Sequence, residues 1–208
     1  MKVLLVNGSP RKNGCTNLAL ETVAAALQAE GVETEILWLG TGPVQDCIAC
    51  GKCGETGACV FHDVVEELAA KAQEADGFVF GSPVYYAHPN GRLLSAMDRA
   101  FYSAGRHFRF KPAAAVVSAR RAGTTASMDV IMKHFTINQM PVVSANYWNA
   151  VHGNSPEEAA RDAEGLSTME AIGRNMAWLL TCIELGRENG VEPPVNRKAW
   201  TNFIRADG

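Results

Sequence analysis

The stretch KVLLVNG, residues 2–8, decides the fold of this chain. It is a continuous apolar run closed by Asn7 and Gly8, which is the pattern of a parallel strand buried on both faces. Between Thr16 and Glu30 the apolar residues then recur at helical spacing. Short β-rich runs continue to alternate with longer amphipathic segments along the chain. This alternation predicts an α/β fold with a doubly wound parallel sheet.

The same patterns place the other elements. Strands are expected at residues 2–8, 33–39, 77–83, 113–119 and 141–147. Helices are expected at residues 16–30 and 62–75, around 93–101 and 128–135, and in a long segment that Ser155 caps. We expect one domain over residues 1–208, with a cysteine-rich insert at 46–60 and a C-terminal tail at 191–208.

The composition excludes several classes of protein. A net charge of −3 gives no reason to expect nucleic acid or an anionic membrane as a partner. The first residues hold an apolar run of only four before Asn7, so they do not read as a signal peptide. No stretch approaches the roughly 20 apolar residues that span a bilayer. We therefore expect a cytoplasmic protein with reduced thiols, in which clustered cysteines serve metal or redox chemistry.

The loop after the first strand, NGSPRKNGCTN (7–17), has the parts of a phosphate site. It offers the hydroxyls of Ser9 and Thr16, the guanidinium of Arg11 and the N-terminus of a helix. It is neither a G-x-G-x-x-G turn nor a nucleoside triphosphate loop, and the second strand ends without the acidic residue of a dinucleotide site. A terminal monophosphate fits better, and FMN is the cofactor we expect.

Two further loops belong to the same edge of the predicted sheet. GSPVYYAHPNG (81–91) places two tyrosines where a planar ring would lie, and SARRAGTTAS (118–127) supplies two arginines, a glycine and hydroxyls. The carboxyl ends of parallel strands meet at one edge, so three loops are predicted to converge on one ligand.

The stretch CIACGKCGETGAC (47–59) holds four cysteines spaced C-x2-C-x2-C-x5-C. Structural zinc sites usually combine two separated C-x2-C pairs, whereas consecutive x2 spacings are typical of iron–sulfur ligation. Three interpretations stay open: a [4Fe–4S] cluster, an empty or partly oxidised thiol loop, and zinc. The candidate ligands are Cys47, Cys50, Cys53 and Cys59.

The first loop, the tyrosine loop and the cysteine stretch together resemble the NAD(P)H-dependent FMN reductase and iron–sulfur flavoprotein branch of the flavodoxin-like superfamily. The resemblance covers nearly the whole chain, including WTNFIR (200–205), and implies a five-stranded parallel sheet of order 2-1-3-4-5 with helices on both faces. It also implies a homodimer or homotetramer with FMN near the subunit interface. The FMN-binding residues it implies are Ser9, Arg11, Thr16 and Asn17 for the phosphate, Pro83, Val84, Tyr85, Tyr86 and Asn90 for the ring, and Ser118, Arg121 and Gly123 for the pyrimidine edge.

The charge near the proposed ring indicates the type of electron transfer. Arg120 and Arg121 stand there with no carboxylate before Asp129, and positive charge favours an anionic reduced flavin and two-electron chemistry. The leading hypothesis is an oxidoreductase that takes hydride from NAD(P)H and reduces a small acceptor such as a quinone or flavin. The flavin N5 carries the hydride, so no catalytic side chain is expected.

Two alternatives stay open. The first is an iron–sulfur flavoprotein that carries single electrons between a [4Fe–4S] cluster, FMN and a ferredoxin-type partner. The second is a non-enzymatic flavin-binding or thiol redox-sensing module.

Overall fold

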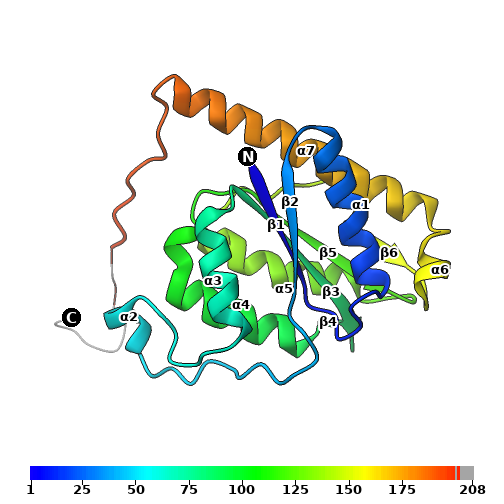
Figure 1. Ribbon diagram of the computed structural model, residues 1–208, viewed down its shortest axis with the longest axis horizontal. Coiled ribbons are helices and arrows are strands. Elements are labelled where there is room, and N and C mark those ends of the chain that lie inside the picture. Colours follow the sequence, from blue (N-terminus) through cyan, green and yellow to red (C-terminus); the bar gives the residue numbers. More distant parts are fainter. Residues whose placement is uncertain (200, 202–208) are drawn as a thin grey trace.

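The computed structural model describes residues 1–199 and 201, and it shows a twisted sheet between two layers of helices (Figure 1). The strands are β1 (Lys2–Asn7), β2 (Glu33–Trp38), β3 (Gly77–Tyr85), β4 (His88–Pro89), β5 (Ala113–Ala119) and β6 (Ala150–His152). Within the described residues the parallel strands have the order β2-β1-β3-β5-β6, and the two-residue β4 pairs antiparallel with β3. This order confirms the predicted doubly wound sheet. Apart from Thr201, the WTNFIR stretch lies outside the described residues, as does the end of the expected tail.

The helices are α1 (Cys15–Ala29), α2 (Lys52–Thr56), α3 (Val64–Glu74), α4 (Gly91–Ala104), α5 (Thr124–Ile137), α6 (Pro156–Ala159) and α7 (Ala163–Glu188), with a 3-10 turn at Gly105–His107. Helices α1 and α7 cover one face of the sheet, and α3, α4 and α5 cover the other (Figure 1). Among the residues that the structure describes, no helix is both long and apolar enough to cross a membrane.

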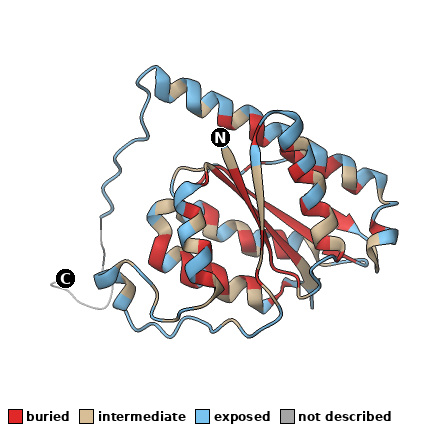
Figure 2. Cartoon of the chain, viewed as in Figure 1, coloured by how far each residue is buried: buried red, intermediate tan, exposed pale blue. Residues whose placement is uncertain are grey.

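The central strands are buried on both faces, as Figure 2 shows. In β1 the side chains of Leu4 and Val6 join the core under α3, α4 and α5, while Val3 and Leu5 join the core under α1 and α7. Successive side chains of a strand point to opposite faces, so a strand covered on both sides needs an unbroken apolar run. This requirement explains the sequence of KVLLVNG.

The edge of the sheet differs from the prediction. The segment at 141–147 forms only an isolated bridge between Val142 and Ala113, and the edge strand is completed by β6 further along the chain. Between these two parts, the side chain of Asn175 on α7 donates to the carbonyl of Ser144 (2.8 Å). Asn175 lies 31 residues after Ser144 and satisfies its carbonyl where the edge strand is interrupted. A pattern of alternating residues cannot predict a contact between positions so far apart in the sequence.

The long C-terminal helix also differs from the prediction, because it is divided into α6 and α7. Ser155 caps α6 as expected, its hydroxyl accepting from the amide of Glu158 (3.3 Å). The carboxylate of Asp162 then caps α7 by accepting from Gly165 N (2.9 Å), and it also accepts from His152 N at the end of β6 (2.7 Å). The second cap therefore ties the start of α7 to the sheet.

Candidate functional site

A cavity of about 200 Å³ opens at the carboxyl edge of the sheet, where the loops after β1, β3 and β5 meet the loop after β6. The three loops that the sequence predicts to converge therefore share one cavity. The predicted residues that line it are Ser9, Arg11, Thr16, Pro83, Val84, Tyr85 and Ser118. The lining also includes Gly14, Cys15, Ala119, Arg120, Gly153 and Asn154.

One end of this cavity is built to hold an anion. Gly14, Cys15 and Thr16 line it at the start of α1, and the N-cap residue Gly14 provides no side-chain hydrogen bond to the helix. By contrast, α3, α4 and α7 each begin with a capping Asp or Asn side chain. The first-turn amides of α1 are thus left for a ligand, and the positive end of the helix dipole favours a negative one. With the Arg11 guanidinium beside them, these groups fit a phosphate monoester such as that of FMN.

The phosphate loop is held in shape by Asn7, a residue that the sequence analysis did not single out. Its buried side chain accepts from Ser9 N (3.0 Å) and donates to the carbonyl of Lys12 and to Oδ1 of Asn17 (both 3.1 Å). Asn17 also donates to Glu21 (2.8 Å) and is not in the cavity lining. The structure therefore places Asn17 in the support of the loop. A buried asparagine at the end of a strand is the signal that could have identified Asn7.

Two buried hydrogen bonds join the loops to each other. The hydroxyls of Thr16 and Ser118 lie 2.8 Å apart and connect α1 to the end of β5. Asn90 donates to the carbonyl of Gly8 and accepts from Leu93 N (3.0 Å), so it caps α4 and connects it to the loop after β1. Asn90 is expected beside the ring, but the structure places its side chain between these loops and not in the cavity lining.

The turn between β3 and β4 has an unusual backbone. Its two residues, Tyr86 and Ala87, both have positive φ angles (52° and 57°), as in the tight hairpin turns that usually take Asn and Gly. Gly123, with φ of 90°, packs against this turn, since a Cβ at that position would lie 2.5 Å from the Cα of Ala87. Gly123 therefore supports the turn that carries Tyr85 to the cavity, while the Tyr86 side chain is fully exposed and outside the lining.

The two arginines after β5 are placed differently. Both are exposed, but Arg120 is in the cavity lining, whereas Arg121, which the resemblance implies for the pyrimidine edge, is not. Both arginines follow the end of β5 at Ala119 and lie in a loop, and the sequence does not show which of two adjacent loop residues borders the cavity.

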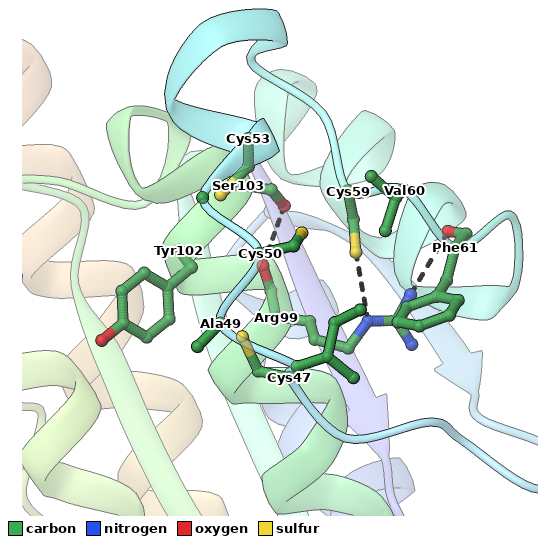
Figure 3. A pocket seen from close by; sticks show the side chains of 12 residues that line it. Cys47, Ala49, Cys50, Cys53, Cys59, Val60, Phe61, Arg99, Tyr102 and Ser103 are labelled. Atoms are coloured by element: carbon green, nitrogen blue, oxygen red, sulfur yellow. Dashed lines mark hydrogen bonds between the residues drawn. The ribbon is translucent and has the colours of Figure 1, made fainter.

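A second cavity, of about 360 Å³, lies beneath the cysteine stretch. Figure 3 shows the side chains of Cys47, Cys50, Cys53 and Cys59 around it, together with Arg99. The backbone wraps around the cavity through two left-handed glycines, Gly51 and Gly57, which flank the short α2. The structure therefore brings all four predicted ligands to one cavity.

The donor set has the chemistry of an iron–sulfur site. A [4Fe–4S] cluster is held by four cysteine thiolates, and four cysteines line this cavity. Within residues 1–199 and 201, no group of three or more His, Cys, Asp or Glu side chains is placed to hold a single metal ion. Four thiolates are also the ligands of a structural zinc site, so zinc stays an alternative interpretation of the cysteine stretch.

Arg99 of α4 is the functional candidate that the sequence analysis missed. Its side chain is 1% exposed, its Nε donates to Cys59 Sγ (3.3 Å), and its guanidinium pairs with both carboxylate oxygens of Asp63 (2.7 and 3.0 Å). Burial is the largest single influence and lowers the pKa of Arg99, but the hydrogen bonds to Asp63 and Cys59, together with the attraction of these groups, outweigh burial and raise that pKa above its ordinary value. Its position three residues after Ala96 and four before Ser103 puts it on the buried face of α4. A charged residue on an apolar helix face is the signal that identifies it.

The chain matches the NADPH-dependent FMN reductase family over residues 1–155. It is 34% identical over 192 residues to an iron–sulfur flavoprotein of Methanocaldococcus jannaschii, with 88% of this chain and 100% of that protein covered. Solved structures that share its fold include the two that follow. A flavone reductase has a TM-score of 0.68 at 18% identity, over 88% of this chain and 64% of that one. A flavodoxin from the domain Archaea has a TM-score of 0.61 at 14% identity, over 87% and 99%. The chain therefore belongs to the NADPH-dependent FMN reductase family, in its iron–sulfur flavoprotein branch and with a flavodoxin-like fold, and it is an FMN-dependent oxidoreductase.

Proposed function

We propose that this protein is an iron–sulfur flavoprotein that moves electrons between FMN at the carboxyl edge of the sheet and a [4Fe–4S] cluster in the cysteine cavity. The observation that carries the proposal is the gathering of Cys47, Cys50, Cys53 and Cys59 around one cavity. When bound, FMN supplies hydride chemistry at N5 and exchanges electrons singly or in pairs. A centre of this kind can connect a two-electron donor such as NAD(P)H to a one-electron partner such as a ferredoxin.

The residues of the first cavity divide the binding of FMN between them. The amides at the start of α1, with Ser9, Thr16 and Arg11, hold the phosphate. Pro83, Val84 and Tyr85 flank the ring at the open side of the cavity, and Arg120 faces it from the end of β5. Gly123 acts through the turn at Tyr86 and Ala87.

The protein is further proposed to act in the cytoplasm as a homodimer or homotetramer. Large aromatic side chains support an interface, because Tyr85 in the lining of the first cavity, and Tyr147 and Trp148 shortly before β6, are each about half exposed. A neighbouring subunit would cover the ring and exclude water from it.

The experiment that tests the proposed function is anaerobic purification followed by a visible spectrum, iron and sulfide assays, and size-exclusion chromatography with light scattering. We expect flavin bands, a broad cluster absorption and about four irons per chain. A flavin spectrum that stays free of iron after reconstitution with iron and sulfide would contradict the cluster. The protein would then be an NAD(P)H-dependent reductase of small acceptors, the second candidate, which the placement of Arg120 at the cavity supports.

The phosphate site is tested by Arg11→Gln. A charge-assisted hydrogen bond to phosphate contributes about 1.5–3 kcal/mol, so we expect the dissociation constant of FMN to rise roughly 10- to 100-fold. Fluorescence titration of the apoprotein with FMN measures this change. The control is Lys12→Gln, which removes a neighbouring cation that lies over Trp38 and outside the cavity lining. An equal loss in both variants would mean that Arg11 contributes only general charge.

The role of Arg120 is tested by its effect on the flavin potential. Arg120→Gln removes a cation from the cavity lining and should make the anionic reduced flavin less stable, by about 1 kcal/mol at most for an exposed charge pair. This corresponds to a fall of about 20 mV in the two-electron potential. Spectroelectrochemistry measures the change, and Arg121→Gln, at the adjacent position outside the cavity lining, should shift the potential less. A larger shift of the flavin potential in Arg121→Gln than in Arg120→Gln would assign the contact with the flavin ring to Arg121.

A further inference from the structure

One buried arginine, Arg99, forms hydrogen bonds with the backbone on both sides of the cysteine stretch. Arg99 donates to the carbonyl of Gln45, two residues before the first cysteine (3.1 Å), and to the carbonyl of Phe61, two residues after the last (3.2 Å). One side chain therefore closes the segment that carries all four thiols. Figure 3 shows it beside Cys59 and Phe61, at the wall of the cavity.

The orientation of this guanidinium is fixed from its other side. Asp63 accepts two hydrogen bonds from it, and the same carboxylate accepts from Val65 N at the start of α3 (3.0 Å). The Phe61 ring lies 5.0 Å from the guanidinium carbon, within cation–π distance. Asp63 thus connects Arg99 to the N-terminus of α3. The guanidinium cannot rotate away from the cysteine stretch without breaking its two hydrogen bonds to Asp63.

All five N–H groups of Arg99 are directed to acceptors. Nε donates to Cys59 Sγ, one terminal nitrogen donates to Gln45 and Asp63, and the other donates to Phe61 and Asp63. A guanidinium has five such donors, whereas the ammonium of lysine has three and no fixed plane. The site is therefore specific for arginine, and one of its five donors is directed to a cysteine sulfur.

The charge of Arg99 has a consequence for any cluster bound here. Hydrogen bonds to the sulfurs and the local net charge are among the factors that set the potential of an iron–sulfur cluster. Reduction adds negative charge, and a permanently charged, buried donor on one ligand stabilises that charge. The cluster potential should therefore be higher with Arg99 in place than without it.

We infer that Arg99 is a positioning residue with two effects: it closes the cysteine loop before any cluster binds, and it raises the reduction potential of the bound cluster through Cys59. The second effect rests on the proposed function, because it requires a cluster in the cavity. The first does not, since it concerns the chain alone.

The potential is measured by electron paramagnetic resonance during a redox titration of the protein with its cluster. Arg99→Gln should shift the cluster potential downward, and Arg99→Lys, which keeps the charge, should shift it less. The control is Arg92→Gln on the same helix, which removes a partly buried arginine that donates to the carbonyls of Thr41 and Gly42 and does not line the cysteine cavity. Equal potentials in the wild type and Arg99→Gln would overturn the tuning role.

The loop closure is measured on cluster-free protein by trypsin cleavage after Lys52, inside the cysteine stretch. We expect cleavage to be about tenfold faster in Arg99→Gln and in Arg99→Lys, and unchanged in Arg92→Gln. Circular dichroism reports whether the rest of the chain stays folded, and the lysine variant serves if the glutamine variant unfolds. Equal cleavage rates in all variants would overturn the closure. If the wild type binds no cluster after reconstitution, the proposed function fails while the cleavage rates still decide this role.

Discussion

Replacing Gly123 by alanine is expected to destabilise the protein by about 2–5 kcal/mol and to weaken FMN binding at least tenfold. A left-handed backbone costs a non-glycine residue about 1–2 kcal/mol, and inserting a methyl group into a packed site costs about 1–3 kcal/mol more. The new methyl would meet the Cα of Ala87 at 2.5 Å, so the turn that presents Tyr85 to the cavity must move. Destabilisation and loss of the cofactor therefore have one cause.

Thermal unfolding with and without FMN measures both effects. For a chain of this length the melting temperature of the apoprotein should fall by roughly 5–15 °C. The control is Gly91→Ala at the start of α4, where a Cβ would meet nothing within 4 Å and the backbone is not left-handed. It should leave the melting temperature and FMN binding almost unchanged. Normal FMN binding by Gly123→Ala would show that the turn is not part of the flavin site.

Replacing Cys53 by alanine is expected to remove the iron while leaving the flavin in place. Four thiolates hold a [4Fe–4S] cluster, so the loss of one should reduce the iron content from about four per chain to less than one after aerobic handling. The FMN cavity has no lining residue in common with the cysteine cavity, so the flavin content should stay at the wild-type value. Assays of iron, sulfide and flavin on the same preparation measure the cluster content and the flavin content of each variant.

The matched control for this variant is Cys182→Ala. Cys182 is an exposed cysteine on α7 and is not in the lining of the cysteine cavity. It should leave both iron and flavin unchanged. Full iron content in Cys53→Ala would contradict the assignment of Cys53 as a ligand, and loss of flavin in the same variant would mean that the two cavities depend on each other.

The sequence was sufficient to predict those strands and that site whose character depends only on the residues they contain. Continuous apolar runs located β1, β3 and β5, because a strand covered on both faces has no polar side. Hydroxyls, glycines and an arginine after the first strand identified an anion site, because the strand ends share one edge of the sheet. These inferences need no knowledge of distant contacts.

The parts that could not be predicted depend on pairs of residues far apart in the chain. Asn175 bonds the chain at the interruption of the edge strand, and Arg99 reaches a cysteine 40 positions earlier. The resemblance assigned Asn17 to the FMN phosphate and Asn90 to the ring, but residue type does not show whether an asparagine at the start of a helix faces a ligand or bonds a neighbouring segment. The structure shows that both bond neighbouring groups.

Helix α4 links the two cavities with a fixed geometry. Its N-cap is bonded to Gly8 at the FMN edge, and Arg99 stands eight residues after Gly91 at the cysteine cavity. A helix advances about 1.5 Å and turns about 100° per residue, so these eight residues correspond to about 12 Å along its axis. Inserting one residue between them would rotate Arg99 out of the core even though every loop kept its sequence. Inserting a whole turn would restore the direction of the side chain but move Arg99 about 5.4 Å along the axis, away from Gln45, Phe61 and Asp63. The number of residues between Asn90 and Arg99 therefore sets the separation between the flavin edge and the cysteine stretch.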